Sequence, residues 1–291
     1  MGESENLPFT IRPIHDVKEL AQVSELEKVI WQSDDPVPVA HAITSVDNGG
    51  MVIGAFLGDK IIGFQYSFAG FNGINTYLCS YLLGVHPKYR IGGIGEQLKL
   101  AQCKEALKIG YDLITWTYDP LETVNANLNI KKLGGVCSTY IENYYGNMED
   151  SLNAGIPSDR FYVDWWIQSD HVKDKVDRVG GKLPKYQEDL AVIKVNEREK
   201  EYPIPEEVNT HLTADYEILF VPVPGEFQKI KEEDFDLALE WRLQTRKVFT
   251  HYFKAGWQVS DFIKSERKEN VSPVYYYVLT KRGEDKTIQN K

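Results

Sequence analysis

The chain has 291 residues, a formal net charge of −10 and 42% hydrophobic residues, values typical of a globular enzyme. The excess of 43 acidic over 33 basic side chains disfavours broad nucleic-acid binding. No apolar run approaches the roughly 18–20 residues of a membrane-spanning helix, so we expect no membrane partner. Three widely spaced cysteines and six scattered histidines indicate no disulfide framework and no metal site, and they suit a reducing cytoplasm.

The N-terminal part of the chain predicts an alternation of strands and helices. Phe9 to Ile14 alternates as a strand does, and Asp16 is placed to cap an amphipathic helix that ends near Trp31. Residues 77–85 are apolar almost throughout, so we expect a strand with both faces buried. The other predicted elements up to residue 145 are helices at 39–46, 96–109 and 124–133, and strands at 51–57, 61–69, 113–118 and 136–145.

A glycine-rich stretch, Arg90-Ile91-Gly92-Gly93-Ile94-Gly95, separates the strand at 77–85 from the helix at 96–109. A strand, a glycine turn and a helix in this order point free backbone N–H groups at one spot, where phosphate binds well. The pair Glu96-Gln97 replaces the Lys-Ser/Thr of a Walker loop. Leu98 replaces the third glycine of a dinucleotide-binding loop.

The pattern Arg90-x-x-Gly93-x-Gly95 resembles the acyl-CoA pyrophosphate loop of the GNAT superfamily of N-acetyltransferases. The likeness covers about the first 150–170 residues, with elements in the order that the superfamily uses. The tracts 115–121 and 155–160 resemble a subgroup of predicted acetyltransferases without an assigned substrate. The resemblance implies an α/β (α+β) fold, in which helices flank a mixed, mostly antiparallel twisted sheet.

The resemblance also implies where acyl-CoA binds. The pantetheine arm is expected beside Leu83 and Val85, where the strand splays from the next parallel strand and Gly84 forms a bulge. Asn125 is expected to bond the pantetheine or the edge of the pyrophosphate. The pyrophosphate itself is expected on the residues Arg90, Ile91, Gly92, Gly93, Ile94, Gly95 and Glu96.

Acyl transfer to an amine needs a base for the amine, donors for the oxyanion and an acid for the leaving thiolate. Superfamily members often place a tyrosine near the thiolate, and the matching position here is Ile130. The tyrosines that can substitute for it nearby are Tyr118, Tyr140, Tyr144 and Tyr145, and among them we expect Tyr118 to supply the proton. Asp119 and Glu142 are candidate bases, as is a chain of water molecules, and Asp119 is also placed to cap the next helix.

The chain changes character after residue 145. We expect a core domain at 1–168 and a C-terminal α/β extension at 169–291 that packs on it. The extension can form a small subdomain or extend the same sheet, and it can wall the substrate pocket or form a homodimer contact. Its predicted elements, after a loop at 146–159 and a strand at 161–167, are a connector at 169–208 with a helix at 171–179, a strand at 216–223, a helix at 232–254 and strands at 257–263 and 274–280.

These features favour a cytoplasmic acyl-CoA-dependent N-acyltransferase. We expect acetyl-CoA to be the cosubstrate and the acetyl group to pass directly to a primary amine of a small molecule or peptide. One alternative is a non-catalytic CoA-binding sensor or scaffold with the same fold. Another is a transferase that uses an acyl donor other than CoA.

Overall fold

The computed structural model describes residues 9–32, 34–90, 92–146, 155–179, 184–196, 202–212, 216–265 and 272–283. The chain divides into two compact units. The first ends at Trp116 and takes in Trp166–Gln168, and the second contains Thr117–Trp165 and the chain from Ser169 onward. This division falls earlier than residue 168, and the domain boundary expected there stays a prediction.

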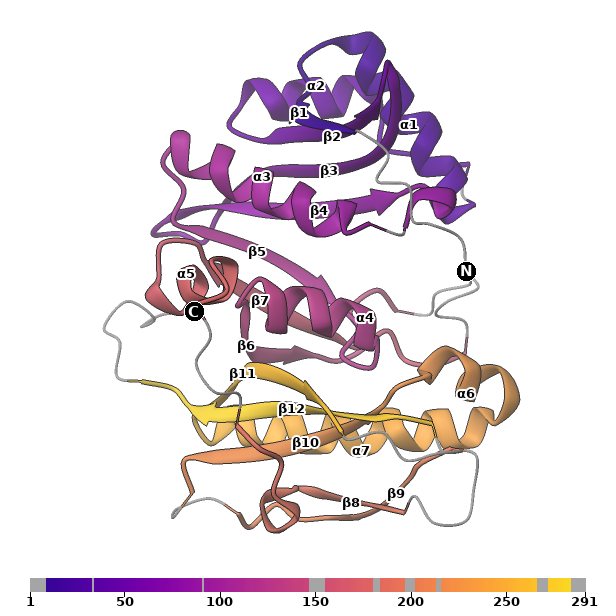
Figure 1. Ribbon diagram of the computed structural model, residues 1–291, viewed down its shortest axis with the longest axis vertical. Helices are drawn as coiled ribbons and strands as arrows, with labels where there is room; N and C mark the ends of the chain where they lie inside the picture. Colours follow the sequence, from indigo (N-terminus) through magenta and orange to yellow (C-terminus); the bar gives the residue numbers. More distant parts are fainter. Residues whose placement is uncertain are drawn as a thin grey trace. The chain divides into compact units, whose positions relative to one another are not determined.

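The first unit is built on a mixed, mostly antiparallel sheet, as the sequence predicted (Figure 1). Neighbouring strands pair antiparallel except β4 and β5, which are parallel. The strands, in their order across the sheet, are β1 (Thr10–Pro13), β2 (Met51–Leu57), β3 (Lys60–Phe71), β4 (Thr76–Val85) and β5 (Leu113–Tyr118).

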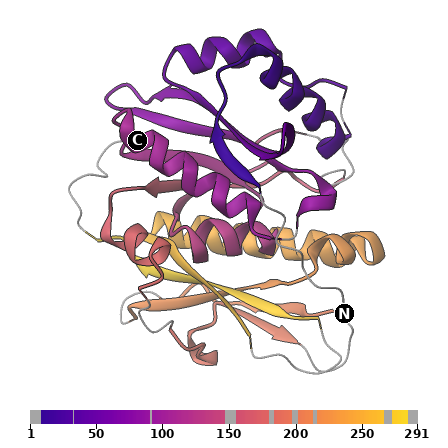
Figure 2. The same cartoon turned by 45° about the horizontal axis from the view of Figure 1, so that its top comes forward.

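The helices of the first unit cover both faces of the strands β2 to β4, as Figures 1 and 2 show. A Cβ atom at Gly63 would lie 3.2 Å from Ile94 on one face, while a Cβ at Gly84 would lie 2.7 Å from Ile30 on the other. The helices are α1 (Val17–Trp31), α2 (Val39–Asp47) and α3 (Ile94–Lys108), with a 3₁₀ turn η1 (Pro87–Tyr89) before α3. Asp16 caps α1 as predicted, because its carboxylate accepts from the backbone N–H groups of Lys18 and Glu19.

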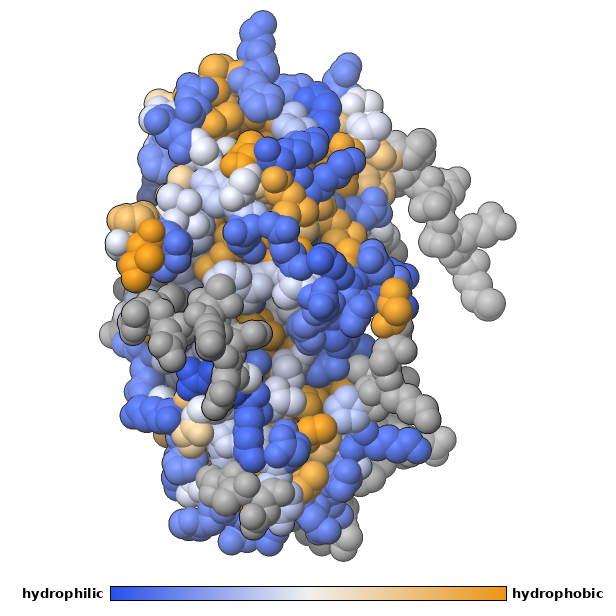
Figure 3. Space-filling view, turned by 90° about the vertical axis from the view of Figure 1, so that its left-hand side faces the viewer, coloured by the Kyte–Doolittle hydropathy of each residue, from blue (hydrophilic) through white to orange (hydrophobic). Residues whose placement is uncertain are grey.

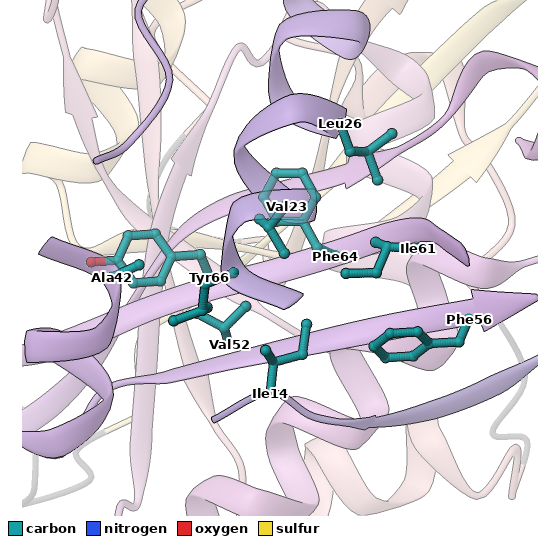
Figure 4. Close-up of a cluster of buried hydrophobic side chains, with 10 residues drawn as sticks. Ile14, Val23, Leu26, Ala42, Val52, Phe56, Ile61, Phe64 and Tyr66 are labelled. Carbon is teal, nitrogen blue, oxygen red and sulfur yellow. The ribbon is translucent and has the colours of Figure 1, made fainter. Parts of the chain in front are cut away.

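A hydrophobic core lies under α1 and α2 (Figure 4). Burying a large apolar side chain there stabilises the fold by about 1.5–3 kcal/mol. Tyr66 brings the one hydroxyl group of this cluster. The buried members are Ile14, Leu20, Val23, Leu26, Ala42, Val52, Phe56, Ile61, Phe64 and Tyr66.

The second unit holds strands that all pair antiparallel. Val259 of β11 pairs with Cys137 of β6, so the C-terminal part of the chain extends the sheet that contains β6. Of the two alternatives left by the sequence, a small subdomain or an extension of the same sheet, this pairing agrees with the extension. In spatial order the strands are β7 (Arg160–Trp166), β6 (Val136–Ile141), β11 (Trp257–Lys264), β12 (Val274–Lys281) and β10 (Ile218–Pro224).

Several helix boundaries in the second unit differ from the prediction. The helix expected at 232–254 is two helices, because Asp234 leaves helical geometry and caps the second through a bond from the Leu237 N–H. The helix expected at 124–133 is a short α-helix that continues with π-helical spacing. The helices are α4 (Thr123–Ala126), the π-helical η2 (Asn127–Lys132), α5 (Asp170–Val176), a 3₁₀ turn η3 (Glu188–Leu190), α6 (Phe227–Glu233) and α7 (Phe235–Lys254).

Two strand predictions are also wrong. The strand expected at 136–145 ends at Ile141, where a turn begins that contains Asn143 at a φ of 46°. The connector expected at 169–208 contains two short strands, β8 (Ile193–Asn196) and β9 (Ile204–Val208), which form a separate antiparallel pair.

On the face drawn in Figure 3, hydrophilic residues surround the apolar ones. Among the helices of the described ranges, none has the length and apolar character needed to cross a bilayer.

Candidate functional site

The loop that opens α3 leaves space in front of its backbone. Gly92 and Gly93 have φ angles of 115° and 74°, a region that favours glycine, and Gly93 is the N-cap of α3. A Cβ atom built at either glycine would meet no other atom within 4 Å. Ile91 lies outside the described residues. The loop therefore forms an open cradle where a ligand can approach the main chain.

The cradle presents backbone donors. No described residue accepts a hydrogen bond from the N–H of Gly93, Ile94 or Gly95, while the Gly93 carbonyl accepts from Gln97 N–H at 3.1 Å, in the normal helical pattern. Ile94 is 4% exposed, because its side chain is anchored in the core beneath the loop. The partial positive charge of the helix N-terminus adds to these donors. The arrangement suits a phosphate or pyrophosphate group.

Cationic side chains lie near His86, between the end of β4 and the loop. Arg90 donates from Nε to the carbonyl of Val85 at 3.4 Å, which ties the loop to the end of β4. The pKa of His86 is lowered, first by desolvation and then by the charges of Lys60, Lys88 and Arg90. Three cations therefore lie near the start of the loop, although the whole chain is acidic. Sequence reasoning named Arg90 alone, and Lys88 in the tract before the loop was a signal that it missed.

The strand that leads into the loop has an unpaired edge. On its β5 side, β4 pairs only at Leu78 with Ile114 and at Cys79 with Thr115. On its other side, pairing with β3 continues to Val85. In the last part of β4, which includes Leu83, the backbone groups that point away from β3 therefore have no strand partner in the described register. Such an edge can hydrogen-bond an extended amide chain.

The bulge in β4 lies at a different residue from the one predicted. Tyr66 pairs with Leu82 but Ser67 pairs with Ser80, so Tyr81 is the extra residue. The bulge turns Tyr81 outward to 53% exposure, and the prediction that both faces of this strand are buried is therefore wrong. Gly84 stays in register with Phe64, and its missing Cβ lets α1 pack closely instead.

Tyr118 and Asn125 belong to the second unit. Tyr118 is 5% exposed, and its hydroxyl lies 3.2 Å from that of Tyr277. Burial raises the pKa of Tyr118 well above its ordinary value, so the group keeps its proton. Asn125 is exposed on α4, whereas Asn129, four residues on, is buried. The two asparagines therefore do not share one exposed face, because the helix widens between them.

The candidate bases already have partners. Asp119 Oδ2 accepts from Arg242 Nη2 at 2.5 Å, and Asp119 Oδ1 accepts from the Leu121 N–H at 2.9 Å. This second bond lies in the turn before α4, whose N-cap is Glu122, so the prediction that Asp119 caps the helix is wrong. Glu142 lies 3.4 Å from Arg246. Ile130, which stands at the usual tyrosine position, is fully buried. Among the described residues there is no group of three side chains that could hold a metal ion.

No family model and no curated protein matches the chain. Solved structures of acetyltransferases do match. The alanine N-acetyltransferase of ribosomal protein S18 from Escherichia coli is 15% identical, with a TM-score of 0.45, over 56% of this chain and 96% of its own. A putative acetyltransferase from Salmonella typhimurium, solved with acetyl-CoA, is 17% identical, with a TM-score of 0.46. The match covers 55% of this chain and 95% of that protein.

An aminoglycoside acetyltransferase from an uncultured soil sample, solved with trehalose, is 20% identical, with a TM-score of 0.37, over 42% of this chain and 84% of its own. The printed names of all three describe acetyltransferases.

Proposed function

We propose that this protein is an acyl-CoA-dependent N-acyltransferase that passes an acetyl group from acetyl-CoA to a primary amine. The observation that carries the proposal is the open cradle of N–H groups at Gly93, Ile94 and Gly95. A diphosphate placed there would accept from these donors and meet Arg90 at its side. Such N–H groups open every α-helix, and here the glycines Gly92 and Gly93 leave them accessible to a ligand beside Arg90.

The β4 edge complements the cradle. A pantetheine arm contains two amides. The backbone groups near Leu83 that lack a strand partner are suitable partners for them, as is the N–H of Val85, whose carbonyl accepts from Arg90. The same edge can place an N–H beside the thioester carbonyl, where negative charge develops during attack by an amine. Holding the thioester and the amine in line would supply much of the rate enhancement.

Proton transfer needs an acid for the leaving thiolate. We retain Tyr118 as the proposed acid, since its raised pKa keeps it protonated. Asn125 remains a proposed partner of the cofactor, because it is exposed and its amide can both donate and accept. We also propose a cytoplasmic setting, to which the free thiols of Cys79, Cys103 and Cys137 are suited.

Calorimetric titration with acetyl-CoA tests the proposal. We expect saturable binding at micromolar to millimolar ligand, and we expect replacement of Gly93 by tryptophan to abolish it, because the indole would fill the cradle. A thiol-reactive dye can then report the release of CoA from acetyl-CoA when primary amines are added. The absence of acetyl-CoA binding at millimolar concentration would refute the proposal.

A non-catalytic CoA sensor or scaffold is the second candidate. Ile130 stands where superfamily enzymes often have a tyrosine, and Asp119 and Glu142 are engaged in ion pairs. A sensor would bind acetyl-CoA with the same dependence on Gly93. It would release no CoA above the background rate with any amine.

A further inference from the structure

An open hollow of about 320 Å³ lies in the first unit between α2 and β3. Its walls offer hydroxyl, amide, imidazole and aromatic groups, and none of these lining side chains is a carboxylate, a lysine or an arginine. A polycationic ligand would find no counter-ion on these walls. An uncharged, partly aromatic body fits them better. The lining residues are His41, Thr44, Ser45, Asn48, Phe68 and Ala69.

His41 is held in this hollow by a buried tyrosine. Tyr66 Oη lies 2.9 Å from His41 Nδ1, and the two rings meet edge to face with centroids 6.3 Å apart. Tyr66 is only 2% exposed, and its hydroxyl points out of the core beside Ala42 (Figure 4). When Nδ1 donates to Tyr66, the lone pair of Nε2 can accept a proton. His41 is thus an exposed base whose ring is oriented by a buried hydroxyl group, and bases that abstract protons are usually oriented by a second group in this way.

The hollow lies at the start of the unpaired stretch of β4, because its wall residues Phe68 and Ala69 pair with Cys79 and Leu78, the β4 residues that still pair with β5. Tyr66 pairs with Leu82, which is three residues, or about 10 Å, from Val85 at the end of the strand. The bulged residue Tyr81 packs against Tyr66 with ring centroids 6.1 Å apart and against Phe68 with centroids 5.9 Å apart. A row of aromatic rings therefore connects the wall of the hollow with the proposed path of the acyl group.

We propose that this hollow binds the acyl acceptor, a primary amine on an uncharged aromatic body, and that His41 is its general base. This inference rests on the proposed function. His41 Nε2 takes one proton from the ammonium group, and the neutral nitrogen attacks the thioester carbonyl carbon. The new C–N bond forms, the C–S bond breaks, the second amine proton passes to the thiolate, and the imidazolium releases its proton to solvent. Tyr66 acts as a positioning residue for His41.

Release of CoA from acetyl-CoA with phenethylamine as the acceptor tests the proposal. We expect His41→Ala to lower kcat by roughly 10²-fold or more, the usual size of a general-base effect, with an unchanged Kd for acetyl-CoA. Added imidazole should restore part of the rate, which it would not do if His41 were only structural. Tyr66→Phe should lower kcat less, because the base remains but its ring is no longer held. His15→Ala, at an exposed histidine outside the hollow, is the control.

A second variant fills the hollow without touching His41. Ala69 is exposed at the wall, so Ala69→Trp should fold and should raise the KM for phenethylamine by at least roughly tenfold. Ala255→Trp, at an exposed alanine after α7, is the matched control and should leave KM unchanged.

The outcomes separate the two proposals. A protein that binds acetyl-CoA but releases no CoA with phenethylamine, or that prefers kanamycin, overturns the acceptor site and leaves the cradle intact. A wild-type kcat in His41→Ala, or an unchanged KM for phenethylamine in Ala69→Trp, also overturns the proposed acceptor site. A failure to bind acetyl-CoA would instead refute the proposed function on which it rests.

Discussion

The side-chain nitrogen of Lys99 lies 3.5 Å from the centroid of the Trp116 ring, and it also donates to Ser80 Oγ at 3.0 Å. Lys99 is 2% exposed on α3, the helix that begins at the proposed phosphate cradle. Burial lowers the pKa of Lys99 well below its ordinary value. Desolvation is the largest cause, so the interior disfavours the charged form of this amine.

This burial predicts how stability depends on pH. The unfolded chain binds a proton on Lys99 up to a pH of about 10.4, whereas the folded chain binds it only below its lowered pKa. Between these values the unfolded state binds more protons, so the free energy of unfolding rises with pH by up to about 1.4 kcal/mol per pH unit from this group. Lys99→Met should remove that rise.

Urea unfolding of both proteins at several pH values below 10 checks this prediction. The stability of Lys99→Met relative to the wild type should be greatest at the lowest pH of the series and should fall as pH increases. The free energy of unfolding of Lys104→Met, at an exposed position of the same helix, should change with pH as that of the wild type does. If Lys99→Met also showed the pH dependence of the wild type, the prediction would be contradicted.

Gly93→Ala should impair acetyl-CoA binding beyond its effect on stability. Gly93 has a φ of 74° and Gly110 a φ of 91°, and neither position has another atom within 4 Å of a built Cβ. Alanine at either position should therefore cost about 1–2 kcal/mol through backbone strain. Only the Gly93 variant places a methyl group in the cradle, so only its Kd for acetyl-CoA should rise. Equal affinities for the two variants in calorimetry would argue against the cradle.

Arg90→Ala should weaken acetyl-CoA binding by roughly 10- to 100-fold. A hydrogen bond to a charged phosphate contributes about 1.5–3 kcal/mol, and the exposed guanidinium keeps donors beyond its bond to Val85. The affinity of Arg90→Lys for acetyl-CoA should lie between those of the wild type and Arg90→Ala. Lysine keeps the positive charge but lacks the several N–H donors of the planar guanidinium. Titrations in increasing salt should narrow the difference between wild type and Arg90→Ala. An Arg90→Ala variant with wild-type affinity would exclude Arg90 from the site.

The fold of the first unit follows closely from local sequence signals. The cap at Asp16, the strands expected at 51–57 and 61–69 and the apolar run at 77–85 correctly located α1, β2, β3 and β4. The loop from Arg90 to Gly95 predicted an anion site, and the structure gives that loop open space and available donors. These features depend on residues close together in the chain.

Features that depend on long-range pairing were not predictable. The bulge at Tyr81 arises from the register with β3, so the sequence suggested Gly84 instead. The hydrogen bond between His41 and Tyr66 joins residues 25 positions apart and carries no motif. Asp119 was a candidate base, but its carboxylate accepts from Arg242, which lies 123 residues away in the chain.

The pair of Asp119 and Arg242 provides a prediction about the second unit. Arg242 is 1% exposed, and its Nε and Nη1 atoms have no hydrogen-bond partner among the described residues, so Asp119 is its main counter-ion. Asp119→Asn should leave a buried charge poorly compensated and should lower the free energy of unfolding by about 3–5 kcal/mol. The double variant Asp119→Asn/Arg242→Met should recover part of that loss, because it removes the charge as well.

Chemical denaturation of the single and double variants measures this coupling. Asp170→Asn, at a carboxylate that is 99% exposed, should change stability by less than about 0.5 kcal/mol. If Asp119 were instead the catalytic base, Asp119→Asn would be as stable as the wild type yet inactive with phenethylamine and acetyl-CoA. Because its two oxygens already accept from Arg242 and from the Leu121 N–H, we expect the loss of stability.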